Sequence, residues 1–182
     1  MHIAKVFLTV VALGFGANAA LASMVWSGVA IDPALVKRVK SDENFLDQLL
    51  SNPPPSRSVY LDKAWHGIHF LLTGSTDSTG ALASKVIFGG ESVGPDQGYG
   101  PAQLLTSAEV KAIAELLSRE TPERLAARYE SKALERAEIY PKVIWVREGP
   151  DALKYVLDYY DKLVKFYQQA AKNGDAVVFV IH

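Results

Sequence analysis

Residues 61–74, LDKAWHGIHFLLTG, say more about the fold of this chain than any other stretch. At about 100° per residue on a helix, the apolar residues between 61 and 72 fall on one broad face. This face comprises Leu61, Ala64, Trp65, Ile68, Leu71 and Leu72. Gly74 is expected to end the helix in a left-handed cap. The stretch therefore predicts a helix that packs against the core of the protein.

Three residues able to bind metals or carry protons fall on one flank of this helix, beside Trp65. Asp62, His66 and His69 are three and four residues apart, which makes them neighbours on a helix surface. In one interpretation, Asp62 caps the helix, and the histidines hydrogen-bond loop atoms and hold the glycine-rich segment 89–101 in place. In a second, the flank is the floor of a ligand cleft, with Trp65 as its apolar wall and a histidine as polar contact or proton carrier.

A metal site is the third interpretation of this flank. H-x-x-H lacks the Glu of H-E-x-x-H, and zinc usually takes three or four ligands. Asp62, His66 and His69 are therefore weak metal candidates, which His182 or Glu91 would have to complete. We expect no metal and no other cofactor.

The patterns on either side of the helix predict a single compact α+β domain. Apolar runs predict strands at 24–31 and at 176–181, and the second run is too apolar to be half exposed. Shorter runs at 86–88 and 143–146 also favour strands. Capping residues and helical spacing predict helices over 32–40, 42–50, 61–72, 106–118 and 151–172, with shorter ones beginning at Thr121 and Ser131. The expected architecture is a small mixed sheet packed with about six helices.

The glycine-rich segment 89–101 is expected to have no regular structure. It lacks Gly-Lys-Ser/Thr, contains no Lys or Arg, and carries Glu91 and Asp96, which would repel phosphate. A phosphate-binding loop is therefore excluded. Long irregular loops are often functional, so Glu91, Asp96 and Tyr99 are secondary site candidates. No G-x-S-x-G is present, and a serine hydrolase has no support.

Residues 1–22 have the features of a secretory signal peptide. A short basic start is followed by a mostly apolar run from Val6 to Ala17 and by Ala20-Leu21-Ala22, which supplies small residues for cleavage after Ala22. The chain has no cysteine, so disulfides and thiolate metal sites are excluded. We expect an exported, periplasmic protein whose domain comprises residues 23–182.

The charge and hydropathy of the remaining chain argue against nucleic acid as a ligand and against a membrane-spanning segment. Of 182 residues, 19 are basic and 20 acidic; removal of residues 1–22 takes away Lys5 and no acid, leaving a net charge of −2. Without a basic cluster, nucleic acid is not expected as a ligand. No later stretch is long and apolar enough to span a membrane. A small ligand and a protein partner both remain open, as does the oligomeric state.

With these residues in view, the chain resembles the YfbM-like family of bacterial proteins, which is defined as a domain of unknown function. The resemblance lies in residues 61–74, 89–91, 98–102 and 174–177, and it extends over the chain from about Met24 to the end. It implies a compact α+β fold and no particular reaction. Family members usually begin at the first strand, so the leader resembles an addition for export. Export argues against cytosolic cofactors such as ATP or NAD.

Two functional hypotheses follow. The first is a non-catalytic module that binds a small ligand or a protein, with an immunity-type role as one form of the latter. Its ligand-binding candidates are Trp65, His66, His69, Glu91 and Tyr99. The second is a hydrolase or lyase in which His66 and His69 work with Glu91 or Asp96 as acid and base.

Three aromatic residues fall on the flanks of the long helix, namely Tyr155, Tyr159 and Phe166. They are either part of a partner surface or ordinary half-buried aromatics.

Overall fold

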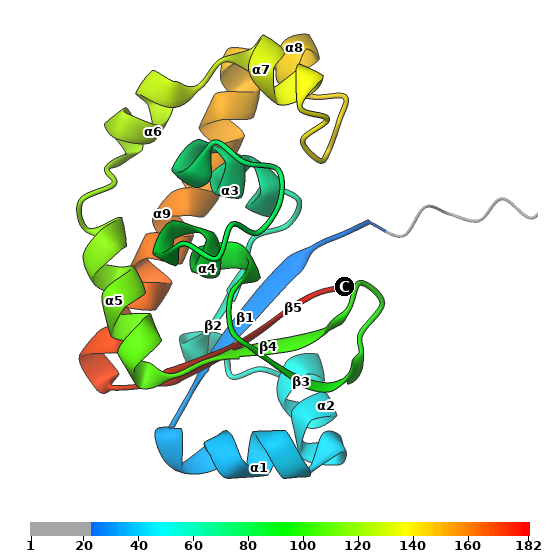
Figure 1. The fold of residues 1–182 in the computed structure, drawn as a ribbon, viewed down its shortest axis with the longest axis vertical. Helices are drawn as coiled ribbons and strands as arrows, with labels where there is room; N and C mark the ends of the chain where they lie inside the picture. The colour runs from blue at the N-terminus through cyan, green and yellow to red at the C-terminus, as the bar shows by residue number, and fades with distance from the viewer. Residues whose placement is uncertain (1–22) are drawn as a thin grey trace, which may run out of the picture.

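The computed structural model describes residues 23–182. These residues form a five-stranded sheet with helices on both faces (Figure 1). The predicted signal peptide and its cleavage after Ala22 concern residues outside this range. The strands are β1 (Trp26–Ile31), β2 (Ser58–Tyr60), β3 (Glu91–Asp96), β4 (Pro101–Leu105) and β5 (Ala176–Ile181). Their spatial order is β2-β1-β5-β4-β3, and every neighbouring pair is antiparallel. The α+β class is confirmed, and the sheet is antiparallel where a mixed one was expected.

The central place of β5 explains its continuous apolar sequence. Val177 and Phe179 point into the larger hydrophobic core on one face of the sheet. Ala176, Val178 and Val180 point into a smaller core on the opposite face. Because successive side chains of a strand point to opposite faces, a strand covered on both sides has no polar alternation. The expectation of a strand inside the sheet is confirmed.

Nine α-helices lie in the described part of the chain, more than the six or so expected. Those on one side of the sheet are α1 (Val36–Ser41) and α2 (Glu43–Ser51) (Figure 1). Those on the other side are α3 (Trp65–Thr73), α4 (Leu82–Phe88), α5 (Ser107–Leu117), α6 (Pro122–Arg128), α7 (Ser131–Arg136), α8 (Trp145–Glu148) and α9 (Pro150–Asn173). Within the described residues, no helix is both long and apolar enough to cross a membrane.

Local sequence signals explain where several helices begin and end. Thr106 and Glu109 form the predicted capping box of α5, in which each side chain bonds the other residue's backbone N–H. Thr121 caps α6 through its hydroxyl. The long helix α9 buries Tyr160, Leu163 and Tyr167 along one stripe and ends at Gly174. These helices are confirmed.

Two short segments predicted to be strands form no strand in the structure. Val86 and Ile87 are buried in α4, which packs between α3 and α5. Residues 143–146 form a turn leading into α8, where Trp145 is buried while Val143 stays exposed. Short apolar runs do not distinguish helix from strand by periodicity, and here the neighbouring helices determine the outcome.

The glycine-rich segment is also more regular than expected. Residues 91–96 form the edge strand β3, and 101–105 form β4, with a turn between them. Val93 and Ala102 are paired across the two strands and anchor them in the smaller core. Pro95 is tolerated because an edge strand has one side without ladder bonds. The prediction of irregular structure throughout 89–101 is therefore wrong.

Helix α3 begins at Trp65, later than the sequence pattern predicts. Asp62 has a φ of 50°, in the left-handed region, so it cannot belong to the helix. The N-cap is Ala64, which makes no side-chain capping bond. Gly74 ends the helix in the left-handed conformation, as expected. The interpretation of Asp62 as the helix cap is therefore wrong.

Candidate functional site

His66 is held between two loops by both of its ring nitrogens. Its Nε2 lies 3.0 Å from the carbonyl oxygen of Thr76, and its Nδ1 lies 3.0 Å from the backbone nitrogen of Tyr140. Because a carbonyl accepts and a backbone N–H donates, the ring is neutral with its proton on Nε2. Burial lowers the pKa of His66, although the hydrogen bond to Thr76 partly opposes this. The ring also stacks on Trp65.

His69 is fully buried one turn further along α3. Its Nε2 lies 3.1 Å from the carbonyl oxygen of Asp77, which must accept the proton. Its Nδ1 has no hydrogen-bond partner among residues 23–182. Burial lowers the pKa of His69 as well. Both histidines thus hydrogen-bond loop atoms, as the first sequence interpretation expects. The atoms belong to the loop after α3 and to Tyr140, however, and not to the glycine-rich segment.

Asp62 belongs to a different group of side chains. Its carboxylate accepts a hydrogen bond of 2.8 Å from the Tyr155 hydroxyl and a longer one of 3.3 Å from Tyr60. The Tyr155 hydroxyl in turn accepts from the backbone N–H of Lys63 at 3.1 Å. Burial, followed by the bond to Asp62, raises the pKa of Tyr155. Asp62 therefore connects α9 to the segment that follows β2.

The acidic candidates of the glycine-rich segment lie apart from the histidines. Glu91 is exposed and pairs with Lys40 of α1 at 2.6 Å. Asp96 holds the turn between β3 and β4, because its carboxylate accepts from the backbone N–H of Gly98 at 2.6 Å and of Gly100 at 3.3 Å. Tyr99 is 45% exposed and lines an apolar cavity of about 240 Å³ with Phe88 and Ile181. The fold therefore does not bring Glu91 or Asp96 into contact with His66 or His69.

The residues suggested as metal ligands do not form a joint coordination set. Asp62 is bonded to tyrosine hydroxyls, whereas the two Nε2 atoms of the histidines donate to carbonyl groups. Across residues 23–182, no three His, Asp or Glu side chains come together in a group that could hold a metal ion.

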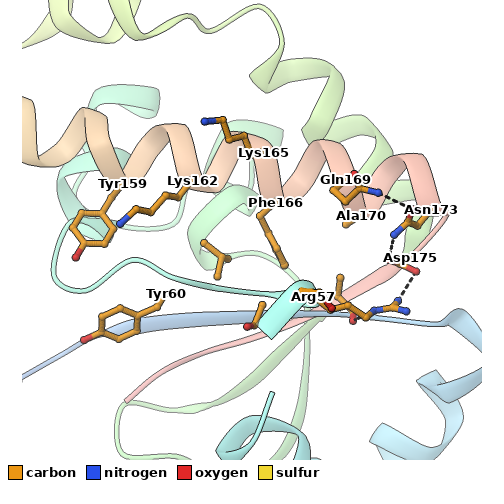
Figure 2. A pocket seen from close by; sticks show the side chains of 14 residues that line it. Arg57, Tyr60, Tyr159, Lys162, Lys165, Phe166, Gln169, Ala170, Asn173 and Asp175 are labelled. Carbon is orange, nitrogen blue, oxygen red and sulfur yellow. Dashed lines mark hydrogen bonds and ion pairs between the residues drawn. The ribbon is translucent and has the colours of Figure 1, made fainter. Parts of the chain in front are cut away.

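A cavity of about 530 Å³ lies between α9 and the β2 edge of the sheet (Figure 2). We call it the α9–β2 groove. Its lining comes from β1, from the segment leading through β2, from α9 and from Asp175, which precedes β5. The lining residues are Ala30, Ser56, Arg57, Ser58, Val59, Tyr60, Tyr159, Lys162, Lys165, Phe166, Gln169, Ala170, Asn173 and Asp175. Figure 2 shows the Phe166 ring pointing from α9 towards the sheet, where it forms an apolar wall.

One end of the groove is closed by a chain of polar side chains (Figure 2). Gln169 donates to Asn173 at 2.8 Å, and Asn173 donates to Asp175 at 3.2 Å. The Nη2 of Arg57 lies 2.7 Å from the other Asp175 oxygen and forms an ion pair with it. The N–H groups of Nη2 do not point at that oxygen, so the contact is not a hydrogen bond. Arg57 also donates through Nε to the carbonyl of Ala30 at 2.9 Å. The nearly buried charge of Asp175 is thereby compensated.

The other end of the groove is aromatic and carries a positive charge. The Lys162 ammonium lies 4.2 Å from the ring centre of Tyr159, close enough for a cation–π contact. No carboxylate of the described residues forms an ion pair with Lys162. Lys165 is different, because it lies at the rim and pairs with Asp161 at 2.5 Å. Lys162 therefore leaves a local positive charge in a chain whose net charge is −1.

The groove includes some residues that the sequence pattern placed on a flank of the long helix and others that it missed. Tyr159 and Phe166 were expected on a flank of the long helix, and both line the groove. Lys162, Gln169 and Asn173 were not singled out. Their positions, taken with the two aromatics, repeat every three or four residues, so they form a second stripe beside the core stripe. That periodicity is the signal that could have found them, whereas Arg57 comes from a distant segment and has no such signal.

The fold and the groove define a class of protein: an α+β domain with a five-stranded antiparallel sheet and an open cleft beside its β2 edge. The chain belongs to the family described as Domain of unknown function (DUF1877), whose model matches residues 23–180. It is similar to the crystal structure of YfbM from Escherichia coli, a protein of unknown function, with a TM-score of 0.69 and 25% sequence identity. The similarity covers 87% of this chain and all of that one. No curated protein matches the sequence.

Proposed function

We propose that this protein is a non-catalytic binding module that is exported to the periplasm and holds a ligand in the α9–β2 groove. The observation that carries the proposal is the groove itself. Its volume of about 530 Å³ lies within the range of about 300–1,000 Å³ common for ligand pockets. It combines an apolar wall at Phe166, aromatic rings at Tyr60 and Tyr159, and the unpaired charge of Lys162. A few polar groups in an apolar cleft suit selective binding.

The alternative proposal is a hydrolase or lyase that uses His66, His69 and Glu91. Such a reaction needs imidazoles that can reach a substrate. Here both Nε2 atoms are engaged by loop carbonyls, and Glu91 pairs with Lys40 in another part of the fold. Neither histidine lines the α9–β2 groove or the cavity beside Tyr99. Binding is therefore the function that the geometry supports best.

The binding proposal predicts where ligands act on the protein. In a spectrum of ¹⁵N-labelled protein, a library of small organic anions and short peptides is expected to shift backbone signals of residues 56–60 and 159–173. Replacing Lys162 by Glu is expected to weaken the binding of anionic hits at least about tenfold, since it reverses the one unpaired charge of the groove. Lys154→Glu is the matched control, because Lys154 lies on the same helix outside the groove and pairs with Asp158.

Two results would count against a binding role in the groove. One is a set of hits whose shifts lie elsewhere in the protein. The other is the absence of any hit together with the absence of a stoichiometric partner in pull-downs from periplasmic extract. Equal losses of affinity in Lys162→Glu and Lys154→Glu would show that only overall charge matters.

Export makes a separate prediction about the mature protein. When the full chain is produced with a Sec-competent host, mass spectrometry of the periplasmic fraction is expected to find a chain beginning at Ser23. Replacing Ala20 and Ala22 by bulkier Leu is expected to leave the precursor uncleaved, because the −1 and −3 positions require small residues. Unprocessed wild-type protein in the cytosol would contradict export.

A further inference from the structure

The outer edge of β2 faces the α9–β2 groove and has backbone groups available for pairing. In the sheet, β2 has one neighbour, β1, and its residues 58–60 oppose residues 27–29. The backbone N–H of Leu61 donates to Trp26 of β1 at 2.9 Å. Since residues of an antiparallel strand alternate between facing the partner and facing away, Val59 also faces β1. The backbone groups of Ser58 and Tyr60 therefore point outward.

Both outward-facing residues also line the groove. Ser58 and Tyr60 belong to its wall, and among residues 23–182 no backbone hydrogen bond of either is found outside the β1–β2 ladder. Tyr60 is 50% exposed, so this residue of the edge is in contact with solvent. An open strand edge beside a cleft is the arrangement by which extended peptides add a strand to a sheet.

The opposite wall of the groove has the length of a short peptide. From Tyr159 to Asn173, α9 extends for about 21 Å at 1.5 Å per residue. An extended chain covers this distance with about six residues at about 3.3 Å each. The prolines at 53–55 precede β2 closely and cannot donate to a ladder, which limits the pairing to the region of Ser58 and Tyr60.

Charge selects among extended peptides. Lys162 has no ion-pair partner within the described chain, while Arg57 is paired with Asp175 and Lys165 with Asp161. Asp62, near the Tyr159 end, is hydrogen-bonded by Tyr155 and Tyr60. An acidic side chain beside Lys162 would meet an uncompensated ammonium and the half-buried ring of Tyr159. A basic one would compete with Lys162 for that ring.

We propose that the α9–β2 groove captures an extended, acidic segment of a protein partner, which adds as a strand to the outer edge of β2 and places a carboxylate at Lys162. This inference rests on the proposed binding function and names the class of its ligand. The backbone of Ser58 and Tyr60 supplies sequence-independent hydrogen bonds. Lys162 and the Phe166 wall both belong to α9, so they supply a preference for an acidic and an apolar side chain two residues apart on the same face of the added strand.

The first test uses a library of random octapeptides displayed on phage, panned against the purified protein. The enriched peptides are expected to share one Asp or Glu with an apolar residue two positions away. Synthetic copies are expected to lose affinity at least about tenfold in Lys162→Glu and to keep it in Lys154→Glu. Enrichment without acidic residues, or equal binding to both variants, would overturn the proposal.

Hydrogen exchange gives a readout specific to strand addition. In the free protein, the amides of Ser58 and Tyr60 are expected to exchange fast, and that of Val59 slowly because it is bonded to β1. A bound peptide should slow exchange at Ser58 and Tyr60 and leave Val59 unchanged. N-methylation of alternate peptide residues should abolish binding in one register and spare it in the other. Unprotected Ser58 and Tyr60 amides in the complex would rule out strand addition.

The same measurements separate this inference from the broader binding function. If small organic anions shift the backbone signals of the groove residues while no peptide is selected, the binding function is supported and the proposal of a peptide ligand is rejected. If neither anions nor peptides reach the groove, both proposals fail. If peptides bind and protect the β2 edge, both are supported.

Discussion

Replacing Trp145 by Ala is expected to lower the free energy of unfolding by about 3–5 kcal/mol, the usual cost of truncating a fully buried tryptophan. The side chain has no exposed surface, and its indole N–H donates to the carbonyl of Ile139 at 2.6 Å. Truncation leaves a cavity beneath α3 and removes the partner of that buried carbonyl. Urea denaturation monitored by circular dichroism measures the loss.

The control for this prediction is Val146→Ala on the same short helix. Val146 is 43% exposed, so its truncation is expected to change the free energy of unfolding by less than about 0.5 kcal/mol. A loss for Trp145→Ala no larger than that of the control would contradict the packing described here.

The contact between Trp145 and Gly67 explains the glycine inside the sequence WHGIH. A Cβ built on Gly67 would lie 2.7 Å from Cη2 of Trp145, closer than carbon atoms approach. Gly67→Ala is therefore expected to destabilise the protein by about 1–3 kcal/mol, although Ala favours helix by about 1 kcal/mol. Combined with Trp145→Phe, the same change is expected to cost less than the sum of the two single losses, because the smaller ring makes room.

Acidification is expected to destabilise the protein through His66 and His69. A proton added to Nδ1 of His66 would face the Tyr140 N–H, so two donors would meet. A proton on Nδ1 of His69 would be buried without an acceptor among residues 23–182. Burial accordingly lowers the pKa of each imidazole below its usual value of about 6.5, while in the unfolded chain each histidine keeps that value.

The direction of the pH effect follows from this difference in proton binding. Above about pH 6.5 both states are neutral and the stability is complete; below it the unfolded chain takes up protons that the folded protein excludes. The free energy of unfolding therefore falls as the pH drops, by at most about 1.4 kcal/mol per pH unit for each histidine, until the folded-state pKa is reached. Each kcal/mol lost corresponds to a decrease of roughly 2–4 °C in the unfolding temperature.

Thermal unfolding between about pH 7.5 and pH 5 tests this prediction, with His66→Gln/His69→Gln as the comparison. Glutamine retains an amide donor for the loop carbonyls and does not titrate, so the double variant is expected to lose much less stability on acidification. It is expected to be less stable than the wild type at neutral pH. If the unfolding temperature depended on pH identically in both proteins, groups other than His66 and His69 would determine the loss of stability on acidification.

Much of the fold could be predicted from local signals in the sequence. The capping box at Thr106, the amphipathic stripe of the long helix and the apolar run at 176–181 each determine one element within a few residues. The failures share a cause. At 86–88 and 143–146, three or four apolar residues carry no periodicity, so packing against α3, α5 and α9 selects helix. In 89–101, pairing with β4 stabilises a strand that Gly94 and Pro95 disfavour locally.

The candidate site illustrates the same division. Helical periodicity correctly placed Trp65 and Ile68 in the core and His66 and His69 beside each other. It also included residues 61–64, although the helix begins only at Trp65. The left-handed backbone of Asp62 turns its carboxylate towards Tyr155, which is far away in sequence. Chemically suggestive residues at short spacing thus belong to separate hydrogen-bond networks.

Sequence alone establishes for this chain the kinds of elements and the identity of their buried faces, because capping and periodicity act within a few residues. The WHGIH helix is such an element, whereas the close approach of Trp145 that requires its glycine is a tertiary contact. The groove between α9 and β2 depends on contacts between Arg57 and Asp175, and between Asp62 and Tyr155. Such contacts bring together segments about a hundred residues apart, and no local rule encodes the distance between them.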